Sequence, residues 1–236
     1  MPNDPGPPPP EPRLWRAVPR GPVLHFAPHP DDEVAGTGGV LAMHRAQGDA
    51  VHVVVATDGI AGDPDRKFAQ KDYAERRRAE SRNGLAEVGV DQVVFWGFPD
   101  NCELSAADVE LGVQSAVREL ERVRPAVVYL PWEREGHPDH HSLFVIVTTA
   151  IARAGWCGWA LGYEVWNAMV PDVIVDVTAF VEQKRRGMLA HESQLEYTRY
   201  DHCMLGLSAY RSMVHLKGRG YGEAFRVVAS PPGAAI

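Results

Sequence analysis

The chain has 236 residues, 45% of them hydrophobic, and its 24 basic and 31 acidic residues give a net charge of −7 at pH 7. This length suffices for one well-packed domain and is cramped for a second. The acidic balance argues against nucleic acid or an anionic membrane as a partner, and no stretch approaches the roughly 20 apolar residues that span a bilayer. Three scattered cysteines without CxxC spacing are typical of reduced thiols, so we expect a cytoplasmic protein. A homo-oligomer stays open.

Residues 1–20 begin with a proline-rich stretch and are predicted to form a disordered tail, and residues 21–236 a single domain. Strands are predicted at Val23–Ala27, Val51–Ala56, Val93–Trp96, Ala126–Leu130, Tyr163–Met169, Val173–Val177 and Phe225–Ala229. Helices are predicted near Gly38–Gln47, Tyr73–Val88, Ala106–Val123, His140–Ala154, Ala179–Ala190 and, with breaks, His191–Arg211.

This alternation of strands and helices predicts an α/β fold, a single Rossmann-like domain. The strand at Val51–Ala56 is a nearly continuous β-branched run, which is typical of a strand covered on both faces. We therefore expect a mostly parallel sheet with helices on both faces and the strand order 3-2-1-4-5-6.

Two short polar segments follow neighbouring strands of this predicted sheet. Pro28–Glu33, with the sequence PHPDDE, comes directly after the first strand, and Gly136–His141, GHPDHH, comes shortly after the fourth. Strands 1 and 4 flank the topological switch point, where loops from their carboxyl ends open into a ligand-binding crevice. Segments more than 100 residues apart in sequence should therefore meet in space.

The residue types in these segments suit a catalytic metal. Two imidazoles and one carboxylate around an open position form a typical catalytic zinc site, and we expect His29, Asp32 and His140 to bind one zinc ion per chain. Asp31 should act as the base toward the attacking water. His137, if protonated, could stabilise the oxyanion or donate a proton to the leaving amine.

Some alternatives stay open at this point. His141 directly follows His140 and could replace it as a ligand. The acidic run at Asp31–Glu33 alone could simply be a favourable first helical turn. Five further histidines are expected to be surface or capping groups, namely His25, His44, His52, His202 and His215.

With these two motifs the chain resembles the PIG-L/LmbE-like N-deacetylase family, over about Val23 to Gln194. The resemblance implies zinc-dependent hydrolysis of an N-acetyl group on an N-acetylglucosamine-containing or related small molecule, that is, an amino-sugar conjugate as substrate. It implies the same zinc ligands and the same roles for Asp31 and His137. It also implies that Arg77 anchors a substrate hydroxyl or phosphate, with a solvated helix cation as the alternative.

Other parts of the resemblance are less specific. Asp176–Thr178, Lys184 and His191–Gln194 match a family-like stretch that we expect to support the site structurally. Glu135 departs from some relatives near the pocket and leaves the choice of substrate open. The chain after Gln194 matches no pattern we can use.

Four rival functions fit single features of the sequence. An NAD-dependent dehydrogenase would use Gly36–Gly39 and Asp58, but Leu41 occupies the third glycine position of the dinucleotide fingerprint. These glycines are better explained by close packing, and Asp58 by a strand-end cap. A phosphoesterase would need more bridging carboxylates. A sugar-binding protein would not need the base Asp31, and a metal-dependent amidase acting on a non-sugar amide stays open.

Overall fold

The computed structural model describes residues 11–234. One eight-stranded sheet runs through the molecule in the order β1-β7-β8-β6-β5-β2-β3-β4. The strands are β1 Arg13–Trp15, β2 Val23–Ala27, β3 Val51–Thr57, β4 Gln92–Phe98, β5 Val127–Pro131, β6 Trp159–Tyr163, β7 Val173–Asp176 and β8 Gly222–Ala229.

The first four predicted strands correspond to β2 to β5, and their expected order 3-2-1-4 is confirmed. The fifth, predicted at Tyr163–Met169, was wrong in its bounds, because the strand beside β5 is β6 at Trp159–Tyr163 and shares only Tyr163 with the prediction. The strand expected next in the order was wrong, because β8 lies between β6 and β7 and is antiparallel to both. The register explains the direction: Asp176 at the end of β7 pairs with Gly222 at the start of β8. The chain therefore returns to the sheet at the end where it left, and the returning strand must run the opposite way.

The segment predicted as a tail is partly ordered. Residues 1–10 lie outside the described residues, but Arg13–Trp15 forms β1, which is parallel to β7. Leu14 packs against a small buried cluster that includes Ile174. The Trp15 ring meets Trp159 edge-on, with their centroids 5.2 Å apart. These two apolar contacts hold the short strand at the sheet edge.

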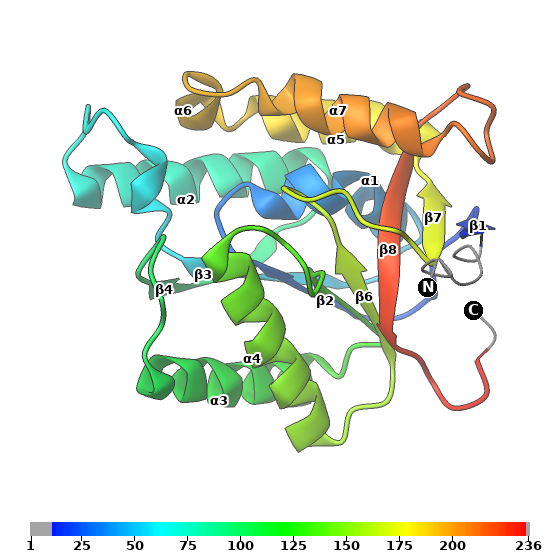
Figure 1. The fold of residues 1–236 in the computed structure, drawn as a ribbon, viewed down its shortest axis with the longest axis horizontal. Coiled ribbons are helices and arrows are strands. Elements are labelled where there is room, and N and C mark those ends of the chain that lie inside the picture. The colour runs from blue at the N-terminus through cyan, green and yellow to red at the C-terminus, as the bar shows by residue number, and fades with distance from the viewer. Residues whose placement is uncertain (1–10, 235–236) are drawn as a thin grey trace, which may run out of the picture.

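Helices cover both faces of the sheet. They are α1 Asp32–Ala46, α2 Gln70–Glu87, α3 Ala106–Val123, α4 Pro138–Ala154, α5 Val181–Leu189, α6 Glu192–Leu195 and α7 Tyr200–Arg211. Figure 1 shows α3 and α4 on one face and α1, α2, α5 and α7 on the other. No helix within residues 11–234 combines the length and apolarity needed to cross a membrane.

Glycines in α1 allow this helix to pack closely against β6 and the segment after β7. A Cβ on Gly39 would lie 2.6 Å from Cβ of Val177, and one on Gly36 would overlap the Tyr163 ring. The packing role expected for Gly36–Gly39 thus matches the structure.

A buried polar clamp ties the C-terminal region to the same helix. Glu223 in β8 accepts hydrogen bonds from the backbone N–H groups of Gly39 and Val40, each at 2.8 Å. Its Oε1 also lies 2.8 Å from Nζ of Lys184 in α5. The Lys184 side chain is only 2% exposed, so its charge is balanced inside the protein. Through Glu223, the C-terminal elements hold α1, the helix whose first turn carries Asp32.

Candidate active site

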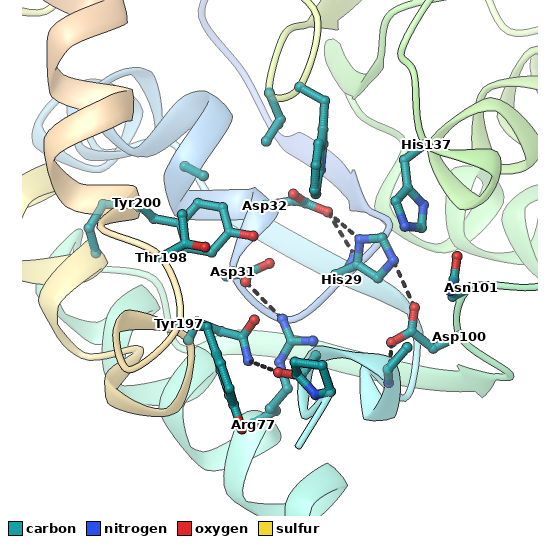
Figure 2. Close-up of a pocket in the computed structure, with 18 residues that line it drawn as sticks. His29, Asp31, Asp32, Arg77, Asp100, Asn101, His137, Tyr197, Thr198 and Tyr200 are labelled. Carbon is teal, nitrogen blue, oxygen red and sulfur yellow. Dashed lines mark hydrogen bonds and ion pairs between the residues drawn. The ribbon is translucent and has the colours of Figure 1, made fainter. Parts of the chain in front are cut away.

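A cavity of about 260 Å³ opens at the carboxyl ends of the central parallel strands. Figure 2 shows His29, Asp31 and Asp32 from the loop after β2, with Asp100 and His137 on one side and Tyr200 on the other. The two motifs that are remote in sequence therefore meet in one pocket, as the predicted topology requires.

Three of the predicted site residues converge on one point. His29 Nδ1 lies 3.0 Å from Asp32 Oδ2, which lies 3.2 Å from His140 Nε2, and the two imidazole nitrogens are 3.3 Å apart. All three side chains are buried. Three such atoms around one zinc ion, with bonds of about 2.0–2.1 Å, would be about 3.3 Å apart in a tetrahedral arrangement. The donor atoms thus have the spacing of a metal-binding face.

Carboxylates hold both imidazoles from behind. His29 Nε2 lies 3.0 Å from Asp100 Oδ1 and 3.0 Å from Asp139 Oδ2. His140 Nδ1 lies 3.4 Å from Glu135 Oε2. Metal-binding histidines usually direct their second ring nitrogen to a carboxylate or carbonyl, which fixes the tautomer and the ring orientation.

The electrostatics of the site favour a cation. Burial disfavours the charged imidazole, yet hydrogen bonds to three carboxylates raise the pKa of His29 well above its ordinary value. Burial likewise opposes the ionised carboxylate of Asp32, but His140 and His29 hold its pKa well below the usual range. A divalent ion would satisfy the same local excess of negative charge.

Two other sets of possible ligands share His29. One is His29, His137 and His140, and the other is His29, Asp100 and Asp139, each with donor atoms within 4.8 Å of one another. The second set uses the opposite nitrogen of the His29 ring, which already lies 3.0 Å from each carboxylate. Donor atoms in the predicted set lie closer together, within 3.3 Å of one another.

Asp31 and Arg77 form a pair at the cavity floor. Arg77 Nη2 donates to Asp31 Oδ2 at 2.8 Å, and Nη1 donates to the carbonyl of Gly59 at 2.7 Å. Arg77 is only 3% exposed, which rules out the alternative of a solvated helix cation. Burial opposes its charge, but the Asp31 carboxylate helps raise the pKa of Arg77 above its ordinary value. The guanidinium therefore fixes one oxygen of Asp31.

His137 occupies the helix N-cap of α4, and its Nδ1 accepts the backbone N–H of Asp139 at 3.3 Å. Its ring centroid lies 4.7 Å from that of His29. Burial and the nearby His29 and His140 lower the pKa of His137. Because Nδ1 accepts a backbone proton, we assign the ring proton to Nε2, which differs from the protonated ring expected from sequence.

Other histidines differ from the sequence-based picture. His141 is exposed, whereas His140 is completely buried beside Asp32. His25 and His44 are also fully buried, so the expectation of surface or capping roles was wrong for them. Burial lowers the pKa of His25 to about 3, and His44 bridges Asp49 and the Tyr129 hydroxyl at 2.9 Å each. Both belong to the core packing.

Several cavity residues were missed by sequence reasoning. Asp100 and Asn101 follow β4, and the rule that ligands bind at the carboxyl ends of the strands could have found them. Trp166 follows β6 and is 58% exposed. Tyr200 comes from the first turn of α7, and Figure 2 shows its hydroxyl directed toward Asp31 and Asp32. No local motif marks Trp166 or Tyr200. By contrast, Asp58 accepts the Ile60 N–H at 3.2 Å, as expected of a strand-end cap.

Residues 24–151 match the protein family described as PIG-L, GlcNAc-PI de-N-acetylase. Diacetylchitobiose deacetylase of Thermococcus kodakarensis is 28% identical over 190 residues, covering 73% of this chain and 69% of the relative. 2'-N-acetylparomamine deacetylase of Streptomyces fradiae is 30% identical over 208 residues, covering 75% of each.

Among solved structures, N,N'-diacetylchitobiose deacetylase from Pyrococcus horikoshii superposes with a TM-score of 0.76 at 25% identity. The superposition covers 88% of this chain and 83% of that one. The shared architecture therefore extends beyond residues 24–151 into the C-terminal elements.

Proposed function

Because the chain belongs to the PIG-L, GlcNAc-PI de-N-acetylase family, we propose that it removes the acetyl group from the nitrogen of an amino-sugar conjugate in a metal-dependent hydrolysis. The observation that carries this proposal is the convergence of His29, Asp32 and His140 within 3.3 Å beside the carboxylate of Asp31. A hydrolase needs both features, whereas binding alone would not need the carboxylate.

We propose His29, Asp32 and His140 as the ligands of one zinc ion. Two nitrogens and one oxygen are a donor set that zinc accepts, and an open position would remain for water or substrate. A bound zinc would polarise the acetyl carbonyl and make the attacking water more acidic. Asp100, Asp139 and Glu135 would keep the two imidazoles in the orientation that directs His29 Nδ1 and His140 Nε2 to the ion.

The proton transfers are assigned to Asp31 and the stabilisation of the developing oxyanion to His137. In the overall reaction, water adds its oxygen to the acetyl carbon, the carbon–nitrogen bond breaks, and acetate and a primary amine leave. Asp31 would accept the proton of the attacking water on a carboxylate that Arg77 holds in place. A neutral His137 would donate a hydrogen bond from Nε2 to the carbonyl oxygen as negative charge develops there, and the proton taken by Asp31 would pass to the leaving nitrogen.

The cavity walls suggest how the sugar is held. Arg77 was expected to anchor substrate, but its two terminal nitrogens already bind Asp31 and two backbone carbonyls, so we assign it to positioning Asp31. The Tyr200 hydroxyl lines the cavity and makes no hydrogen bond to any residue among 11–234, so it is free to donate to substrate. Aromatic rings beside carboxylates suit a sugar, which has apolar faces and hydroxyl edges.

The test is release of primary amine from a panel of N-acetylglucosamine conjugates, with a simple non-sugar acetamide as comparison. We expect turnover that a chelator abolishes and that zinc restores. The panel should include diacetylchitobiose and N-acetylparomamine, because relatives are named for these substrates. Amine release from the acetamide alone would favour the non-sugar amidase, and no release from any compound would refute the deacetylase.

A further inference from the structure

Glu135 is a buried carboxylate that contacts both the proposed metal site and the cavity wall. It directly precedes the second motif, Gly136–His141, and its side chain has an exposure of 0%. Its Oε2 lies 3.4 Å from His140 Nδ1, a long contact, and that nitrogen has no hydrogen-bond partner within residues 11–234. Glu135 is thus the acidic group that faces the rear of this imidazole.

The same carboxylate organises the segment after β6. Glu135 Oε1 accepts the backbone N–H of Val165 at 2.7 Å, and Oε2 accepts that of Trp166 at 3.0 Å. Oε1 also accepts the indole N–H of Trp132 at 3.1 Å. Both Val165 and Trp166 line the cavity. The backbone N–H of Asn167 also reaches Oε1, at 3.5 Å, so four N–H groups from two parts of the chain donate to the two carboxylate oxygens.

The Trp166 ring is the part of this segment that substrate would meet. It is 58% exposed, and its centroid lies 5.7 Å from that of His137. A large aromatic surface that remains open beside a catalytic histidine suits contact with a sugar face. Its backbone is fixed although its side chain is open, which is the arrangement of a preorganised binding wall.

We propose that Glu135 is a positioning residue that couples the metal site to this wall, holding the His140 imidazole and the Trp166 backbone through one carboxylate. A glutamine at this position could not do both. It has one acceptor oxygen, and its amide N–H groups would face at least one of the four donors. A buried donor left without an acceptor is destabilising, so either the imidazole or the wall must shift.

The experiment compares E135Q with two controls in the full-length protein. E133Q changes an exposed glutamate of the same loop. E164Q changes other contacts of the segment after β6, because Glu164 accepts the Met169 N–H at 2.7 Å and pairs with Arg211. Zinc affinity is measured by competition with a chromophoric chelator, and amide hydrogen exchange is measured on peptides that cover residues 164–169.

We expect E135Q to bind zinc about 10–100-fold more weakly and to exchange the Val165 and Trp166 amides faster. E133Q should change neither quantity. E164Q should speed exchange near Met169 while zinc affinity stays at the wild-type value. Wild-type affinity together with wild-type exchange in E135Q would overturn the proposal, and so would a loss of affinity without faster exchange.

The coupling rests on the proposed role of His140 as a ligand, and H140A tests that role separately. If H140A keeps its zinc, the ligand assignment fails. If H140A loses zinc while E135Q keeps it, only the coupling fails. Should E135Q not fold, E135D carries the test, because its carboxylate is one methylene shorter and cannot reach both His140 and the wall. Wild-type zinc affinity and exchange in E135D would then count against the coupling.

Discussion

The segment up to the end of α4 (residues 11–154, the first half) and the shorter segment after it (residues 155–234, the second half) contribute to the site in different ways. The first half supplies the groups proposed for chemistry, from the loops after β2 and β5 and the first turns of α1 and α4 that follow them: His29, Asp31, Asp32, His137 and His140. The second half supplies walls and clamps, from β6 to β8 and from α5 to α7.

This difference reflects how each half finds its position. The motif residues are placed by parallel strands whose neighbours are fixed by topology, so a local sequence pattern is enough to locate them. The walls are placed by tertiary packing between segments that share no pattern, such as Trp166 and Tyr200. The comparison predicts that changes in the first half remove chemistry, whereas changes in the second half remove stability or affinity.

The largest effect is expected at Asp31. Asn at this position keeps an oxygen for the Arg77 hydrogen bond but cannot accept a proton, so D31N should lower kcat/KM by about 10³-fold, as for loss of a general base. Zinc content and the urea midpoint should stay at wild-type values. The control is D65N at an exposed carboxylate. Wild-type turnover by D31N would remove Asp31 from the mechanism.

The sequence was sufficient to bring the proposed chemical groups together because they belong to two motifs, each placed between the end of a strand and the first turn of the next helix. His29, Asp31, Asp32, His137 and His140 lie together as the switch-point argument requires. It was insufficient for Arg77, whose partner Asp31 is 46 residues away and could not be inferred from helix position alone. Burial of the Arg77 side chain beside the partly buried Asp31 decides that pairing, and burial is a property of the folded structure.

A second prediction concerns the clamp in the C-terminal half. K184M leaves the buried Glu223 carboxylate without its cation, which should lower the free energy of unfolding by about 3 kcal/mol. Urea denaturation measures this change. R185M, at an exposed neighbour on the same helix, should cost less than about 1 kcal/mol. Zinc affinity of folded K184M should match that of wild type, and a selective loss of zinc without loss of stability would contradict the division between the halves.

The fold shows the same limit of sequence reasoning. The helix α1 begins at Asp32, six residues before the predicted start. The prediction began late because glycines lower helix propensity. The structure nevertheless needs glycine at three positions of α1 for close packing: Gly36 against Tyr163, Gly38 against Lys184 and Gly39 against Val177. The position of β8 depends on the end of the sheet at which the chain returns after α7. The packing of α1 and the position of β8 both depend on contacts between distant residues, which leave no local pattern in the sequence. By contrast, α3 has a strong amphipathic pattern and was predicted with the bounds observed.

The smallest predicted effect tests the exception to this division. Tyr200 belongs to the second half, yet its hydroxyl is directed toward Asp31 and Asp32 and is free of hydrogen bonds to residues 11–234. Y200F removes one hydrogen bond to substrate and little packing, so kcat/KM should fall about 10-fold, the size of about 1.4 kcal/mol. Y210F, at an exposed tyrosine on the same helix, should have wild-type kinetics.

If the loss lies in KM alone, Tyr200 binds the sugar equally in ground and transition states; if it lies in kcat, the hydroxyl acts on the reacting carbonyl. Unchanged kinetics in Y200F would confine the C-terminal half to its structural role.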